Sequence, residues 1–120
     1  MKPESLLGVW VGTAHNDNGW DMKITISILK PFEVGSTLGI FDIPMIPCSG
    51  TFRVTDIHDE TIELQAEKVH GECGDADSDS LELLENETLL YVSKGERWET
   101  RGVLKRANDE YIFSRDDDNG

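Results

Sequence analysis

The sequence is poor in basic residues. Its 120 residues include 11 Lys and Arg against 24 Asp and Glu, which gives a formal net charge of -13. Binding to nucleic acid needs clustered Lys and Arg to neutralise phosphates, so this balance argues against nucleic acid as a partner. The acidity is typical of a solubilising surface or a saline habitat. Its sharper interpretation is docking to a basic protein.

Long apolar runs are also missing. No stretch approaches the roughly 20 apolar residues that a membrane helix needs, so we expect a soluble protein without membrane contact. Residues 1–5 carry one base and then an acid, and Gly8 and Gly12 interrupt the apolar stretch that follows. This pattern is unlike a secretory signal, and a cytoplasmic location is therefore expected.

Alternation of apolar and polar residues is the clearest pattern present. From 20 to 28 every even position is apolar and every odd position is polar, which predicts a half-buried strand whose even positions face inward. The segment 80–90 fits one strand followed by the start of the next, and it also fits one short helix. Further strands are expected over 7–15, 35–42, 48–56, 60–70, 80–85, 88–94 and 97–106, with a short ninth candidate at 111–113.

These short strands predict an all-β protein. About eight strands joined by tight turns favour an antiparallel up-and-down barrel, because closure removes both sheet edges and leaves room for side chains or one small ligand. The chain length is that of one domain. We expect residues 1–115 to form this single β-barrel domain and the acidic tail 116–120 to be disordered.

The first predicted strand contains the pattern Gly8-Val9-Trp10. With the strand count, it resembles the opening of the calycin barrels, which include lipocalins, avidins, fatty-acid-binding proteins and nitrobindin-like haem barrels. In those families the Trp plugs the closed end of the barrel, and in lipocalins an Arg from the last strand crosses its indole. The resemblance implies these barrel-closing roles for Trp10 and Arg106, where a guanidinium on an indole face gains cation–π energy.

The resemblance does not extend to the cofactor sites of two of these families. Avidin-like barrels have an Asn two residues after the Trp, where this chain has Gly12. The haem-ligating His of nitrobindin-like barrels lies late in the chain, whereas the histidines here are His15, His58 and His70. Biotin and haem are therefore not expected, and we predict no cofactor.

Cys48 and Cys73 are the two cysteines. Pairing of the segments 48–56 and 60–70 would bring them toward one barrel end, where they could form a disulfide. A reducing cytosol favours two free thiols, whereas in an oxidising compartment the bridge would stabilise the fold by roughly 3 kcal/mol. A zinc site with His70 lacks a second Cys or His pair at finger spacing, so no metal is expected.

The acidic residues Asp75, Asp77 and Asp79 alternate like the first half of a calcium loop. The second half is missing, because Ser80 occupies the position of the required Gly and Asn86 that of the bidentate Glu. We interpret the triplet as an acidic solvated loop between strands.

Catalytic signatures are missing as well. The chain has no Gly-x-Ser-x-Gly, phosphate-cradling loop or dinucleotide fingerprint, and its carboxylates offer no privileged acid–base pair. Aromatic residues near strand ends can flank a barrel mouth and stack on a ligand, although ordinary core or rim packing also explains them. The ligand-binding candidates are Trp20, Met22, Phe52, Tyr91 and Trp98, with Leu64 and Leu104 completing an open lumen.

Three functions fit such a barrel. The first is a non-enzymatic barrel that binds a hydrophobic or amphipathic small ligand. The second is an acidic interaction module whose lumen is filled by side chains and whose surface docks to a basic protein. The third is a barrel isomerase or cyclase, which would need a buried carboxylate or histidine with a shifted pKa. A hollow lumen favours the first function and a filled lumen the second.

Overall fold

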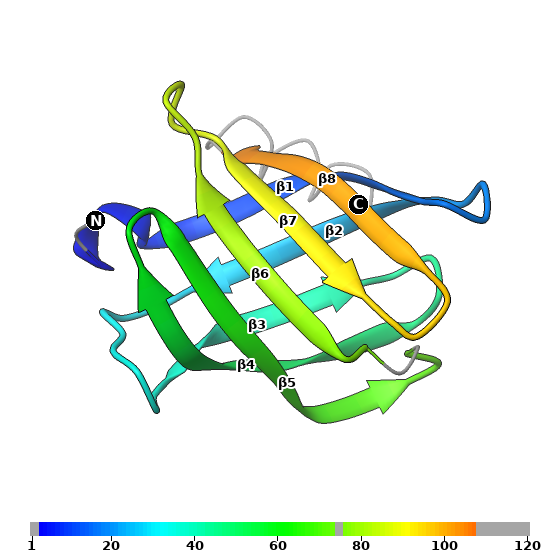
Figure 1. The fold of residues 1–120 in the computed structure, drawn as a ribbon, viewed down its shortest axis with the longest axis horizontal. Helices are drawn as coiled ribbons and strands as arrows, with labels where there is room; N and C mark the ends of the chain where they lie inside the picture. The colour runs from blue at the N-terminus through cyan, green and yellow to red at the C-terminus, as the bar shows by residue number, and fades with distance from the viewer. Residues whose placement is uncertain (1–2, 74–75, 108–120) are drawn as a thin grey trace, which may run out of the picture.

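The computed structural model describes residues 3–73 and 76–107, in which eight antiparallel strands close into one barrel (Figure 1). Each strand pairs with the next in sequence, and the last pairs with the first, so the predicted up-and-down barrel is confirmed. The strands are β1 (Gly8–Asn16), β2 (Asp21–Ile28), β3 (Thr37–Ile43), β4 (Cys48–His58), β5 (Thr61–Gly71), β6 (Ser78–Leu83), β7 (Leu89–Lys94) and β8 (Glu99–Arg106).

The predictions for the C-terminal part of the chain concern both residues that the structure describes and residues that it does not. The helical interpretation of 80–90 is wrong, because β6 and β7 occupy this segment and pair with each other. The ninth candidate strand at 111–113 and the tail 116–120 lie outside the described residues. Within the described ranges, no helix is long and apolar enough to cross a membrane.

Strand β2 shows why the alternation folds as a barrel wall. Met22, Ile24, Ile26 and Ile28 are buried, so the predicted inward face is confirmed for these positions. Trp20 is the exception, since it precedes the strand and keeps 56% of its surface exposed. A register slip by one residue would move all four apolar side chains into water, and this fixes the strand.

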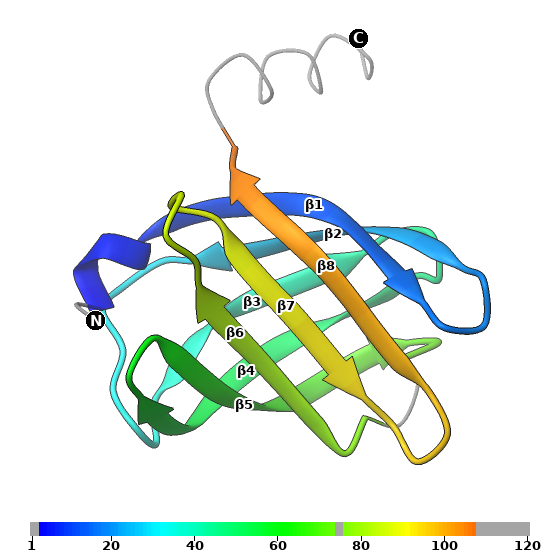
Figure 2. The ribbon, with the colours of Figure 1, turned by 45° about the horizontal axis from the view of Figure 1, so that its top comes forward.

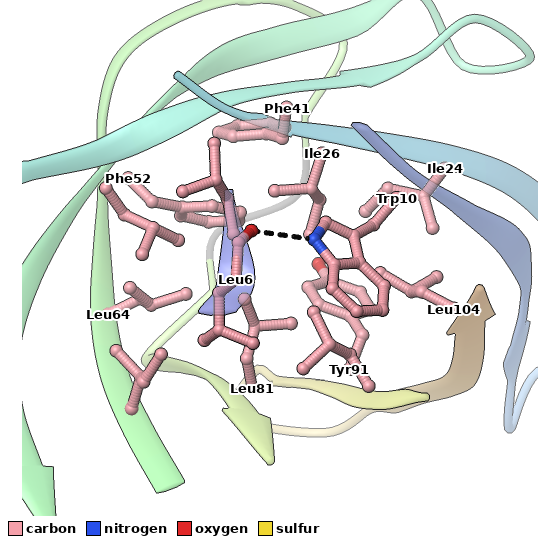
Figure 3. Packing of buried hydrophobic residues seen from close by; sticks show 14 of the residues in the cluster. Leu6, Trp10, Ile24, Ile26, Phe41, Phe52, Leu64, Leu81, Tyr91 and Leu104 are labelled. Carbon is pink, nitrogen blue, oxygen red and sulfur yellow. Dashed lines mark hydrogen bonds between the residues drawn. The ribbon is translucent and has the colours of Figure 1, made fainter. Parts of the chain in front are cut away.

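The N-terminal 3-10 helix η1 (Pro3–Leu6) closes one end of the barrel, and the β1–β2 turn lies at the other end (Figure 2). Leu6 is fully buried, and the indole Nε1 of Trp10 donates a hydrogen bond of 2.9 Å to its carbonyl oxygen (Figure 3). Trp10 itself is only 1% exposed. This bond satisfies the one polar atom of a buried indole and ties the helix to the first strand.

Arg106 covers the same end from outside. Its guanidinium carbon lies 4.4 Å from the ring centroid of Trp10. Its Nη1 donates to the carbonyl oxygen of Leu7 at 2.6 Å, and its Nη2 donates to that of Ser5. The last strand therefore holds the N-terminal segment over the Trp10 ring through cation–π and hydrogen-bond contacts.

Candidate functional site

A cavity of about 550 Å3 opens at the barrel end opposite Trp10. Turns from that end contribute to its lining, through Asn18 between β1 and β2, Ile46 between β3 and β4, and Trp98 between β7 and β8. Cavities of this size hold small molecules in other proteins. The barrel is thus packed solid around Trp10 and hollow toward the opposite mouth.

The hollow half of the lumen is crossed by a row of paired residues in which Ala14 has a small side chain. One row across the sheet runs from Tyr91 to Gly102 and Ala14 and then to Met22, each paired with the next. Ala14 lines the cavity with a single methyl group, and Gly102 lets the β1 backbone approach β8 closely. The neighbouring row toward Trp10 runs from Leu89 to Leu104, Gly12 and Ile24. Leu89 and Leu104 are fully buried in the packed core, and Ile24 lies where this core meets the cavity.

The wall formed by β2, β3 and β4 is apolar. Phe41 and Phe52 stack with ring centroids 4.4 Å apart and an interplanar angle of 26°. Met22, Ile24 and Ile43 extend this surface along the cavity. An apolar ligand group gains transfer free energy of about 25 cal/mol for each Å2 of apolar surface that it buries against such a wall.

The facing wall, from β6 through β8 to β1, carries a row of polar residues. Asp79 pairs with Ser93, Ser93 pairs with Thr100, and Thr100 pairs with Asn16 across successive strands. The amide Nδ2 of Asn16 donates to Thr100 Oγ1 at 2.8 Å. Since all four line the cavity, the lumen has one apolar side and one polar side.

Asp79 is the charged group of this row. It is 6% exposed, and the hydroxyl of Tyr91 donates to its Oδ1 at 3.3 Å. Burial raises the pKa of Asp79 from its usual 3.8, and hydrogen bonds from Ser93 and Tyr91 oppose part of this rise. Burial, with the charge of Asp79 next in size, also raises the pKa of the Tyr91 phenol.

The placement of Asp79 corrects the sequence interpretation of the acidic triplet. Asp79 lies within β6 and points into the cavity, so it is not part of a solvated loop. Asp77 is exposed, and Asp75 lies outside the described residues. Asp79 and Asp77 therefore face different environments, one in the lumen and the other in solvent.

Comparisons of the chain with protein-family models, with curated proteins and with solved structures give no match. The cavity and its two walls are the features from which a function can be inferred.

The structure brings the predicted ligand-binding candidates together. The cavity lining includes all five of them, namely Trp20, Met22, Phe52, Tyr91 and Trp98. Trp20 and Trp98 belong to turns at the mouth, whereas Phe52 and Tyr91 lie inside, with ring centroids 6.5 Å apart. Leu64 and Leu104 were expected to line the lumen, but they are buried in the packed core and do not line the cavity.

Sequence reasoning missed the polar row of Asp79, Ser93, Thr100 and Asn16. A signal for three of them was present in the alternation itself. Asp79 shares the parity of the buried Leu81, Ser93 that of Tyr91, and Thr100 that of Leu104. A polar residue at an inward position of a strand marks a buried polar group, which must find a partner or face a ligand.

Cys48 and Cys73 form a disulfide in the structure, with a Cα–Cα distance of 4.9 Å. The sequence left a disulfide and two free thiols open, and the structure has the disulfide, because the end of β5 returns beside the start of β4 and brings the sulfurs together. Both residues line the cavity near its mouth. The bridge also removes the Cys73 thiolate from any zinc site with His70.

A separate group of side chains could hold a metal ion on the outer surface. Asp56, His58 and Glu63 lie close together at the β4–β5 turn, and all three are exposed. His58 Nε2 lies 3.4 Å from Glu63 Oε2, with both side chains 53% exposed. Exposed acidic groups of this kind commonly occur without a bound ion, and we assign no site to the cluster.

Proposed function

We propose that this barrel binds one small hydrophobic or amphipathic molecule in its cavity and catalyses no reaction. The cavity of about 550 Å3 carries the proposal, since it combines an apolar wall with a few convergent polar groups. The apolar body of the ligand packs against Phe41 and Phe52. Its polar group meets the row that contains Asp79 and Thr100.

We also propose that the likeness to calycin barrels reflects kinship with that group. Support comes from the closed eight-stranded barrel of the described residues and from the placement of Trp10 under Arg106 at its closed end. A shared barrel suggests a shared use as a container for ligands, although fold alone does not define a ligand.

The two alternative functions rest on different observations. The acidic interaction module rests on the formal net charge of -13, and the cavity takes away the support that a filled lumen would have given it. An isomerase or cyclase gains support from Asp79, which supplies a buried carboxyl group beside the Tyr91 hydroxyl. Turnover of a bound compound would favour this third function, and reversible binding without turnover favours the first.

Binding of a neutral apolar dye tests the proposal. Nile red should bind the full-length protein, with fluorescence enhancement that saturates at one dye per chain. Ala14→Leu places a larger side chain into the hollow row and should weaken dye binding by at least about tenfold. Thr13→Leu is the matched control, because Thr13 is exposed on the same strand. Equal binding by both variants would place the dye outside the cavity and contradict the proposal.

A further inference from the structure

Among the described residues that line the cavity, Asp79 alone carries a carboxyl group. The described lining residues include no Lys, Arg or His that could neutralise it. The ion pairs among described residues join exposed side chains, and Asp79 takes part in none of them. A carboxylate that is 6% exposed without a cationic partner is costly to bury.

The contacts of Asp79 leave it able to accept further hydrogen bonds. The hydroxyl groups of Tyr91 and Ser93, both on β7, are hydrogen-bond partners of Asp79. Both hydroxyls are neutral. A carboxylate has about four lone-pair sites, so two donors leave Asp79 able to accept further hydrogen bonds. The strongest partner for the remaining lone pairs is a charged donor.

The surroundings favour a cation over other ligands. The formal net charge of -13 attracts cations to the protein and repels anions. Tyr91, Phe52 and Trp98 add aromatic rings to the cavity lining, and aromatic faces attract organic cations. An alcohol could donate one hydrogen bond to Asp79, but it would leave the carboxylate charge without compensation.

We propose that the ligand of this cavity is an organic amine, whose ammonium group pairs with Asp79 while its apolar body packs against the β2–β4 wall. This inference rests on the proposed binding function and specifies its ligand class. The ammonium offers up to three N–H donors, which the Asp79 carboxylate and the hydroxyls of Ser93 and Thr100 can accept. The Phe41 and Phe52 rings receive the apolar part.

A series of three ligands that differ only in the polar group tests the ligand class. The probes are 2-(1-naphthyl)ethylamine, the corresponding neutral alcohol 1-naphthaleneethanol, and the anion 1-naphthaleneacetate. Isothermal titration of the full chain near neutral pH should show the amine binding at least about tenfold more tightly than the alcohol. The carboxylate should bind most weakly. Equal affinity for amine and alcohol, or preference for the carboxylate, would overturn the inference.

Asp79→Asn tests whether the preference depends on this carboxylate. The variant should abolish the advantage of the amine over the alcohol and change the affinity of the alcohol by less than about threefold. Asp77→Asn is the matched control, because it removes the same charge at an exposed position of the same segment. The control should keep the amine preference, and its loss there would assign the preference to overall charge and overturn the role of Asp79.

The outcomes for the ligand class and for the binding function are separable. Nile red binding that is retained together with equal amine and alcohol affinities would reject the amine and keep the binding barrel. Failure of Nile red and of all three naphthyl probes to bind would reject both. Should Asp79→Asn fail to fold, the three-probe comparison on the unaltered protein still decides the ligand class.

Discussion

Asp79 places an ionisable group where the apolar lumen disfavours charge. Its pKa is raised from 3.8, so the folded state binds the proton more tightly than the unfolded chain does. The stability contribution of Asp79 therefore decreases as pH rises from 3.8 through the folded pKa, and it stays at its lower value above that point. A binding site held at a cost in stability is common in proteins.

We expect Asp79→Asn to be more stable than the unaltered protein at neutral pH, because the amide cannot ionise. This difference should shrink as the pH falls through the folded pKa toward 3.8, and below 3.8 the Asp79 carboxyl is protonated in both states. Urea unfolding at neutral and acidic pH measures it. Asp77→Asn controls for the general loss of one negative charge. A variant that is destabilised equally at both pH values would contradict the predicted burial cost.

Trp10 is the residue on which the closed end depends. Trp10→Ala should lower the free energy of unfolding by about 3–5 kcal/mol, because it removes a fully buried ring and the bond to Leu6. Trp20→Ala makes the same substitution at a residue 56% exposed and should change stability by less than about 0.5 kcal/mol. Chemical denaturation compares the two, and similar losses would show that Trp10 does not anchor this end.

The disulfide links two elements at the cavity mouth, the start of β4 and the segment after β5. Cys48 and Cys73 are separated by 25 residues, for which loop-closure entropy gives about 3.5 kcal/mol of stabilisation. The double substitution Cys48→Ser and Cys73→Ser should lower the free energy of unfolding by about this amount while the barrel still forms.

A reductant provides the control for the disulfide prediction. The unaltered protein in dithiothreitol should approach the stability of the double variant, and the double variant should not respond to the reductant. A protein whose stability and free-thiol count are unchanged by reductant would contradict the prediction. Because disulfides persist in oxidising compartments, the same measurement bears on the expected cytoplasmic location.

The strands were predictable because each barrel strand has one buried face and one solvated face, which gives a period of two. The predicted ranges reach the described strand ends to within two residues. The cavity was not predictable in this way, because its volume depends on which residues share a row. Ala14, for example, lines the cavity together with Met22, Tyr91 and Thr100, which belong to three other strands.

Trp20 and Asp79 show the two ways in which the apolar–polar alternation misled the prediction. It was applied to Trp20, outside a strand, and it was not applied to Asp79, within one. Trp20 has the parity of the inward face but lies before β2, in the turn, where parity no longer fixes direction. Asp79 has inward parity within β6, yet its charge suggested a loop. Charge predicts exposure on average, and a ligand site is where that average fails.

At the scale of the whole molecule, the net charge of -13 generates self-repulsion that opposes compaction. Added salt should therefore raise the melting temperature, since about 0.15 M ionic strength screens charges that lie more than about 8 Å apart. Sodium chloride and calcium chloride at matched ionic strength should act alike, because Asp79 faces the lumen and Asp77 faces solvent.

Thermal melting monitored by circular dichroism in the two salts checks this prediction. A rise in the melting temperature with calcium chloride alone, at micromolar to low millimolar concentration, would indicate a specific cation site and contradict the prediction. A melting temperature that changes with neither salt would show that the surface charges are already paired, and this would contradict the self-repulsion argument.

The seam between β1 and β8 has a consequence for the rate at which the barrel assembles. It pairs Trp10 with Arg106 from opposite ends of the described chain, whereas every other pairing joins consecutive strands. Hairpins close over short loops, but this seam has high contact order, so its formation waits for the intervening strands. A Cβ added at Gly12 or Gly102 would overlap the backbone of the facing strand. These glycines therefore let the first and last strands approach closely enough for the barrel to close.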